Sequence, residues 1–347
     1  MPRVLVTGGA GFIGAALSTA LAERHADWEI VAFDNLARAG SELNLPRLAG
    51  AGVEFVQGDV RELSEVTAVG PVDALVECSA EPSVLAGVDG DTAYTVHTNL
   101  LGAYHCLEHT RAHGAQMIFL STSRVYPTEH MAALPMTEAP TRFELDGDGV
   151  AEDFPLEGAR TLYGATKLAA ELLITEYRAM FGVSGVVNRC GVIAGPWQMG
   201  RRDQGVFTWW LLSHEFEREL AYIGFGGSGK QVRDLLHVDD LVDLIERQLV
   251  DPAAWDGKVV NVGGGREGSL SLLEATELCE ELTGRRARWL DSPGDRPGDI
   301  PVYLSDCSRL FGLTDWRPRR TPRETLSDTL DWIRAHEDVL RDVLVGR

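Results

Sequence analysis

Lysine is scarce in this chain. Of the 32 basic residues among 347, only Lys167, Lys230 and Lys258 are lysines, and the 52 acidic residues give a formal net charge of −20. Nucleic acids and anionic membranes are bound through basic patches, so we expect neither as a partner. The charge does not exclude a phosphorylated small molecule, which needs only a few local donors.

Cysteine pairs and long apolar runs are also missing. The five cysteines are scattered without a CxxC motif, which fits reduced thiols of a cytosolic enzyme better than a disulfide framework or a zinc site. No apolar run reaches the roughly 18 residues of a membrane span. The first residues enter a strand at once, without the charged and apolar regions of a signal peptide. We therefore expect a cytoplasmic protein with no metal site.

A strand, a glycine turn and a helix open the chain. Residues 3–7 have the apolar character of a buried parallel strand, the turn carries Gly8, Gly11 and Gly14, and a helix is expected over about 12–24. Glycines let a backbone approach a pyrophosphate, and the helix N-terminus supplies N–H groups. A dinucleotide site is the interpretation we favour, and a glycine-rich turn without a ligand is the alternative.

An acidic residue at the end of the second expected strand supports that interpretation. Asp34 follows residues 29–33 and lies 20 positions after Gly14. A carboxylate at this spacing accepts hydrogen bonds from the adenosine ribose and repels a 2′-phosphate, which favours NAD over NADP. Arg38 nearby is an argument in the other direction, because it could hold a 2′-phosphate.

Further strands and helices alternate along the chain. This alternation predicts an α/β fold of the Rossmann type, a doubly wound parallel sheet with a smaller C-terminal α/β lobe. We expect residues 1–190, joined by segments near 235–265, to bind NAD, and residues 191–347 mainly to bind substrate. The acidic stretch 136–155 is expected to be a solvated insertion rather than a lid. Further strands are expected over 53–57, 72–76, 116–120, 183–188 and 259–262, and helices over 92–113, 270–282 and 322–344.

Tyr163 and Lys167 lie four residues apart at the start of an apolar-periodic helix. This spacing places both side chains on one helical face. A tyrosine titrates near about 10, and a fixed cation within roughly 4–6 Å lowers its pKa. The pair can therefore transfer protons, although a Tyr and a Lys at this spacing can also form an ordinary surface pair. The scarcity of lysine favours the chemical role, since Arg and Lys are not interchangeable.

Taken together, these motifs resemble the extended short-chain dehydrogenase/reductase family of NAD-dependent epimerases and dehydratases. The resemblance rests on TGGAGFIG at 7–14, Asp34, GDVR at 58–61, Thr122 before Val125-Tyr126, and Tyr163xxxLys167, and it runs from about residue 3 to about 335. It implies NAD as cofactor, a nucleotide-diphosphate sugar as substrate, and catalytic roles for Thr122, Tyr163 and Lys167. It also implies a homodimer packed through the helices of 92–113 and 161–181.

Within the family, several stretches are similar to CDP-tyvelose (CDP-paratose) 2-epimerases, among them residues 34–45, 195–205 and 229–240. Glu77 departs from the pattern, because relatives often have His there. Sugar-nucleotide 4,6-dehydratases carry Asp-Glu directly after the catalytic Thr, so dehydration is not the reaction that we expect. Here Ser123 and Arg124 stand in those positions, and an arginine cannot act as a base near neutral pH.

The resemblance and the motifs together predict an NAD-dependent epimerase that works through a transient ketosugar, at C2 of a CDP-sugar. A UDP-sugar 4-epimerase is the first alternative, and a non-catalytic NAD-sensing protein of the same fold is the second. We expect the cofactor to contact Gly8, Gly11, Phe12, Ile13, Gly14, Asp34, Asn35, Asp59, Val60, Ser79, Ala80, Asn99, Tyr163 and Lys167. We expect the substrate to contact Glu81, Ser123, Arg124, Asn188, Gln204, Arg233 and Arg296.

Overall fold

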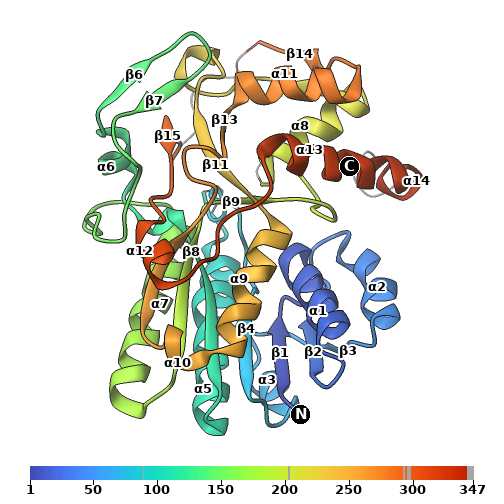
Figure 1. The fold of residues 1–347 in the computed structure, drawn as a ribbon, viewed down its shortest axis with the longest axis vertical. Coiled ribbons are helices and arrows are strands. Elements are labelled where there is room, and N and C mark those ends of the chain that lie inside the picture. Colours follow the sequence, from blue (N-terminus) through green and yellow to red (C-terminus); the bar gives the residue numbers. More distant parts are fainter. Residues whose placement is uncertain (89, 202–203, 292–293, 295–297, 342–347) are drawn as a thin grey trace. The chain divides into compact units, whose positions relative to one another are not determined.

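The computed structural model (Figure 1) describes residues 1–88, 90–201, 204–291, 294 and 298–341. The chain divides into two compact units, each built from separate stretches. Unit 1 contains Met1–Val125, Leu162–Arg189 and Leu241–Val260, and unit 2 contains Tyr126–Thr161, Cys190–Asp240 and the chain from Asn261 onward. The sequence predicts an NAD-binding part of residues 1–190 joined by segments near 235–265; unit 1 includes Leu241–Val260, and residues 126–161 belong to unit 2.

A seven-stranded sheet organises unit 1 and confirms the predicted fold class. Its order is β12-β8-β5-β4-β1-β2-β3, and β1 pairs in parallel with both β2 and β4. The chain winds outward in one direction through β2 and β3 and in the other through β4 and β5, so the winding reverses beside β1, where such sheets bind ligands. The strands are β1 (Arg3–Thr7), β2 (Glu29–Asp34), β3 (Glu54–Gln57), β4 (Ala74–Glu77), β5 (Gln116–Thr122), β8 (Gly185–Cys190) and β12 (Lys258–Val262).

Alternate strand residues of this sheet form an apolar layer with the helices of one face. Leu5, Leu75 and Met117 are fully buried together with Leu107 of α5 and Ala170 of α7. α5 packs on β4 and β5, and α7 packs on α5. Of the apolar run expected over 168–174, Ile174 is buried in this layer and Leu173 packs against it, whereas Leu172 is exposed. The helices of unit 1 are α1 (Phe12–Arg24), α2 (Leu45–Gly50), α3 (Leu63–Ala68), α4 (Thr92–Val96), the π-helical turn η2 (His97–Leu101), α5 (Gly102–His113), α7 (Leu162–Phe181) and α10 (Pro252–Trp255), with η1 (Ser41–Asn44) and η3 (Ser123–Val125) as short 3-10 turns.

Unit 2 is built around β11 (Val232–His237). This strand pairs antiparallel with β13 (Ser269–Ser271) and in parallel with β15 (Val302–Tyr303) and β9 (Val192–Ala194). α8 (Val206–Glu215), α11 (Leu272–Thr283) and α13 (Pro322–Ala335) pack on one another. The remaining elements are α6 (Thr128–Ala132), β10 (Glu219–Leu220), η4 (Phe225–Gly227), β14 (Arg288–Trp289), α12 (Ser308–Leu313), α14 (Glu337–Leu340) and α9 (Val238–Val250), which continues from β11 into unit 1.

The acidic insertion is not a solvated loop over its first part, so that prediction was wrong. β6 (Met136–Glu138) and β7 (Phe143–Leu145) form an antiparallel hairpin. Leu145 is buried with Val232, Val302 and Leu304, and Arg142 pairs with Glu274 at 3.3 Å. The apolar residues that alternate with the acidic ones are what docks the hairpin, and composition alone conceals this pattern.

The expected closing helix over 322–344 is interrupted, which corrects a second prediction. α13 ends at Ala335 and α14 begins at Glu337, with His336 outside helical geometry. The His336 ring lies 4.7 Å from the Trp197 ring, and its Nδ1 is 2.9 Å from the carbonyl oxygen of Trp332. These ring contacts hold the break. Residues 342–344 lie outside the described part of the chain.

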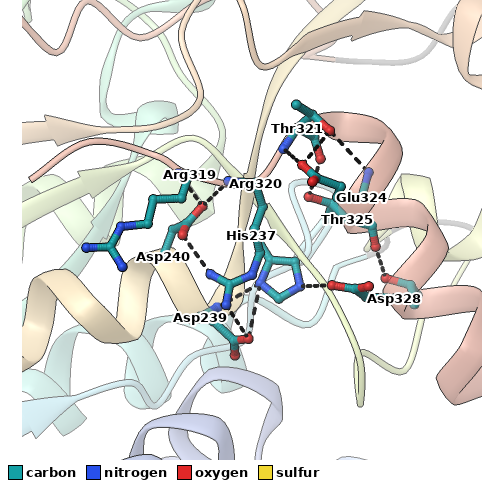
Figure 2. A network of polar contacts seen from close by, with 10 residues as sticks. His237, Asp239, Asp240, Arg319, Arg320, Thr321, Glu324, Thr325 and Asp328 are labelled. Carbon is teal, nitrogen blue, oxygen red and sulfur yellow. Dashed lines mark hydrogen bonds and ion pairs between the residues drawn. The ribbon is translucent and has the colours of Figure 1, made fainter.

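A carboxylate at the start of α9 fixes the segment that leads into α13 (Figure 2). Asp240 Oδ2 accepts hydrogen bonds from the backbone N–H groups of Arg319 and Arg320, both at 3.0 Å, and Oδ1 accepts one from the Arg320 side chain at 2.7 Å. α13 then begins with a capping box formed by Thr321 and Glu324.

In the described residues, no helix has both the length and the apolar character to cross a membrane.

Candidate active site

α7 carries both residues of the expected proton-transfer pair. Tyr163 and Lys167 lie one turn apart on this helix, as predicted, and Gly164 lies between them. A Cβ placed on Gly164 would meet the carbonyl oxygen of Arg124 at 2.0 Å. Only a glycine lets the first turn of α7 approach the turn η3 so closely. The helix start is thereby held against residues 123–125, which directly follow Thr122.

Gly164→Ala should therefore disrupt the site from within. Because the methyl group has no room, we expect a stability loss of about 1–3 kcal/mol, typical of overpacking, together with a large loss of turnover. Urea unfolding and steady-state kinetics measure both. Gly312→Ala in α12 is the matched control, since nothing lies within 4 Å of a Cβ at that position. Equal effects of the two substitutions would contradict the steric argument.

Thr122 ends β5 and is buried, and its Oγ1 accepts a hydrogen bond from the Arg124 N–H at 3.2 Å. The preceding residue, Ser121, donates to Glu171 Oε1 at 2.5 Å. Glu171 lies one helical turn after Lys167 and forms a buried ion pair with Arg189 of β8 at 2.8 Å. Sequence reasoning missed this network. It ties α7 to β5 and β8 close to Thr122 and Lys167.

Lys167 does not reach toward solvent. Its Nζ lies 3.1 Å from Oε2 of Glu77, the last residue of β4, and the two side chains are 2% and 1% exposed. Burial raises the pKa of the Glu77 carboxyl, and the Lys167 ammonium acts in the opposite direction. The sequence marked Glu77 as a departure from the family pattern, but gave no sign of its partner 90 residues away.

The glycine turn after β1 fits a dinucleotide. Gly8 has a φ of +65°, and a Cβ there would meet the Cys78 carbonyl oxygen at 2.8 Å; at Gly14 a Cβ would meet the Gly8 oxygen at 2.2 Å. α1 starts at Phe12 and Ile13, with no side chain capping its first N–H groups. Backbone N–H groups at such a helix start suit a pyrophosphate, so these residues could hold NAD.

Asp34 lies beside that turn, as its spacing predicts. Its Oδ2 accepts from the Ala10 N–H at 3.1 Å and its Oδ1 from the Leu36 N–H at 2.8 Å. Burial raises its pKa, and the backbone hydrogen bonds oppose this. The carboxylate therefore sits where an adenosine ribose would complete its hydrogen bonds.

We expect the wild type to bind NADP at least about tenfold more weakly than NAD, because a carboxylate facing a 2′-phosphate places like charges together. Asp34→Ala should reduce the difference between the affinities for NAD and NADP, as measured by calorimetry with both dinucleotides. Glu29→Ala, at the opposite end of the same strand, should leave this difference unchanged. Equal wild-type affinities would contradict the role assigned to Asp34.

Asn35 and Asp59 form a second polar group near the end of β2. The Asn35 amide donates to Asp59 at 2.9 Å, and the Arg61 side chain donates to Asp59 at 2.6 Å. The hydrogen bonds from Arg61 lower the pKa of Asp59 to about 2, against partial burial. Asp59 is thus a fixed carboxylate, and Val60 beside it is buried. The contact of Asn35, Asp59 and Val60 with the cofactor stays a prediction.

Asn99 is fully buried in the π-helical turn and holds the loop after β4. Its amide oxygen accepts from the Glu81 N–H at 2.8 Å, and its amide nitrogen donates to the Glu81 carbonyl at 3.1 Å and to Thr166 at 3.3 Å. The loop that contains Ser79 and Ala80 is therefore tied to α7. These contacts give Asn99 a structural role beside the cofactor contact we predict for it.

The predicted substrate contacts are divided between the two units. Asn188 is completely buried in unit 1, where its amide pairs reciprocally with that of Gln248 at 2.9 and 2.8 Å. In unit 2, Arg233 pairs with Asp299 at 2.6 Å, and Gln204 exchanges backbone hydrogen bonds with Arg201. Arg296 lies outside the described residues. Ser123 and Arg124 form the η3 turn beside Thr122.

Comparisons with known proteins show the family and the fold of the chain. The model of the NAD dependent epimerase/dehydratase family matches residues 4–263. The CDP-paratose 2-epimerase of Salmonella typhi is 28% identical over 343 residues, covering 95% of this chain and 98% of that protein. The dTDP-glucose 4,6-dehydratase of Mycolicibacterium smegmatis is 32% identical, with 96% and 94% covered. The structure of the UDP-glucose 4-epimerase of Thermus thermophilus with NAD superposes with a TM-score of 0.80 at 27% identity, covering 96% of this chain and 99% of that one.

Proposed function

Because the chain belongs to the NAD dependent epimerase/dehydratase family, we propose that it epimerises a nucleotide-activated sugar, at C2 of a CDP-sugar. NAD is the cofactor of this family, and the resemblance of the sequence motifs to it is confirmed. The observation that carries the proposal is the start of α7. Gly164 lets the first turn of α7, which carries Tyr163, pack against the turn after Thr122, and Lys167 follows one helical turn later. The turn after Thr122 contains no Asp-Glu pair.

Bound NAD would accept a hydride from the sugar carbon and later return it. Tyr163, as the phenolate, would take the proton of the hydroxyl on that carbon, which leaves a ketosugar. Thr122 would hold the oxygen during the transfer. After the ketosugar turns its other face, Tyr163 would give the proton back to the oxygen as the hydride returns. Proton and hydride are both restored, so the reaction is an isomerisation with no net redox change.

The choice of epimerase over dehydratase rests on Ser123 and Arg124. Removal of water from a sugar needs an additional acid and base, and a guanidinium does not release its proton near neutral pH. Similarity to the CDP-paratose 2-epimerase across nearly the whole chain supports C2 of a CDP-sugar. A UDP-sugar 4-epimerase is the second candidate, supported by the structural similarity to the Thermus thermophilus enzyme.

Product NMR and mass spectrometry distinguish these reactions. The NAD-loaded protein would be incubated separately with CDP-paratose, CDP-tyvelose, UDP-glucose and dTDP-glucose. We expect inversion at C2 of the CDP-sugars with unchanged mass. Inversion at C4 of UDP-glucose would establish the second candidate instead. Loss of one water from dTDP-glucose would contradict both.

Arg233 is our proposed contact for the substrate diphosphate, because a guanidinium binds phosphate bidentately and keeps its charge. Its ion pair with Asp299 is also the basis of the alternative, in which Arg233 only fixes a loop. Arg233→Ala should raise KM at least about tenfold while NAD affinity is retained. Arg323→Ala is the control, since Arg323 forms an exposed pair with Glu281 in the same unit. A lowered melting temperature with an unchanged KM would favour the alternative.

We also propose a homodimer. The apolar side chains of Tyr104 on α5 and of Leu172, Met180 and Phe181 on α7 are exposed, and helices that present apolar residues to solvent suit a second copy of the chain. Light scattering would give the molar mass in solution, and a monomer at micromolar concentration would contradict the proposal.

A further inference from the structure

Glu77 occupies a position that the sheet otherwise gives to apolar core residues. It lies two residues after Leu75 in β4, and therefore on the same face, which α5 and α7 cover. Its neighbours in register are Thr7 of β1 and Phe119 of β5. A carboxylate here is completely buried at the end of the central strands.

The charged partner of Glu77 is Lys167, at 3.1 Å. The ammonium also lies 4.0 Å from the centre of the Phe119 ring, which offers the negative face of its π-system. From α5, the thiol of Cys106 faces the pair, and burial raises its pKa, so it stays neutral. From α7 itself, Tyr163 lies one helical turn before Lys167 and Glu171 one turn after it, and the Glu171 carboxylate is paired with Arg189. Among the described residues, Glu77 is the carboxylate with which Lys167 forms an ion pair.

A lysine buried this deeply would not keep its proton unaided. Removing an ammonium from water favours the neutral amine and lowers the pKa of a fully buried lysine by up to about 3–5 units. An opposite charge at hydrogen-bond distance restores the preference for the charged form. Removing one member of such a pair leaves the other buried without compensation.

We propose that Glu77 is a positioning residue that keeps Lys167 charged and holds it at the carboxyl end of the sheet, one helical turn from Tyr163. Its consequence for catalysis rests on the proposed function: only a charged Lys167 can favour the Tyr163 phenolate. The carboxylate also offsets part of the field of the ammonium at Tyr163. For this reason the titration of Lys167 itself, rather than turnover, is the direct readout.

The scarcity of lysine makes this titration simple to follow. In an NMR spectrum, a protein labelled with 13C only in lysine gives signals from Lys167, Lys230 and Lys258 alone. The signal that disappears in Lys167→Met is the signal of Lys167. In Glu77→Gln we expect the Lys167 side chain to lose its proton at a lower pH than in the wild type, while the signals of Lys230 and Lys258 respond to pH as before. Glu138→Gln is the matched control, because Glu138 pairs with Lys230 but is 63% exposed; the pH response of the Lys230 signal should change little.

A Lys167 titration that is the same in Glu77→Gln and wild type would overturn the proposal. If Glu77→Gln does not fold, the melting temperatures of Glu77→Asp and of the apolar double variant Glu77→Leu/Lys167→Met replace the titration. If both Glu77→Asp and Glu77→Leu/Lys167→Met fold, the result supports Glu77 as the counter-ion of Lys167. If neither folds, the site needs glutamate for another reason, and the proposal is wrong. None of these measurements uses a sugar substrate, so a wrong assignment of the reaction would leave them intact.

Discussion

Tyr163→Phe is expected to lower kcat by at least the roughly 10²–10⁴-fold that general acid–base catalysis contributes. The substitution keeps the ring that packs at the start of α7 and removes the hydroxyl that would exchange the proton with the sugar. NAD should still bind, and the melting temperature should stay close to that of the wild type. Steady-state turnover of the CDP-sugar, with bound NAD measured after denaturation, provides both quantities.

Tyr177→Phe is the matched control for that experiment. Tyr177 lies on the same helix, and its hydroxyl donates to Glu108 at 2.5 Å. Losing this hydroxyl should leave kcat within a factor of about two, since Tyr177 is on no proton path that we propose. A Tyr163→Phe enzyme that turns over as fast as Tyr177→Phe would show that another group transfers the proton.

Breaking the Glu171–Arg189 pair should have the largest effect on stability. Both side chains are 6% exposed, and the Arg189 side chain contacts both Glu171 oxygens, at 3.2 and 2.8 Å. Arg189→Met leaves the Glu171 carboxylate buried without its counter-ion, which typically costs about 3–5 kcal/mol. Urea unfolding measures this loss. Turnover should fall as well, because Glu171 also accepts a hydrogen bond from the Ser121 hydroxyl. Ser121 is the neighbour of Thr122, so a displaced Glu171 would disturb the position of Thr122.

Two comparisons make that prediction specific to a buried charge. Glu171→Met/Arg189→Met removes both charges and should recover much of the stability lost in the single variant. Arg178 lies on the same helix as Glu171 and pairs with Asp256, with side chains 49% and 33% exposed. Arg178→Met should therefore lower the free energy of unfolding far less than Arg189→Met does. If Arg189→Met proved as stable to urea as Arg178→Met, the Glu171–Arg189 pair would not be important for holding α7 in place.

The parts of the fold that follow from local pattern could be predicted. Residues 4–6 and 30–33 are apolar because parallel strands are buried on both faces. Gly8 and Gly14 are glycines because their backbones leave no room for a Cβ, and the pair Tyr163 and Lys167 follows from helical spacing. The strand and helix patterns act within about 20 residues of sequence, as does the crowding at Gly14, whereas the crowding at Gly8 comes from Cys78.

Contacts between distant residues could not be predicted in the same way. Periodicity tells which face of an element is buried but not which side chain it meets. Glu77 is marked by its departure from the family pattern, yet Lys167 is 90 residues away. Asn188 looked like a polar group at the end of a strand, and the structure buries it against Gln248. The hairpin of 136–145 was concealed because its acidic residues dominate the composition while its alternate apolar residues dock on β11 and β15.

The central claim is that the enzyme oxidises and reduces the same sugar carbon while Tyr163 carries the proton. A CDP-sugar with deuterium on C2 tests it most directly, with products examined by NMR and mass spectrometry after turnover in ordinary water. We predict a C2-epimerised product of unchanged mass that retains the deuterium, because the hydride leaves the carbon and returns without meeting solvent. Exchange of the deuterium for solvent hydrogen, or a product lacking one water, would contradict the proposed reaction.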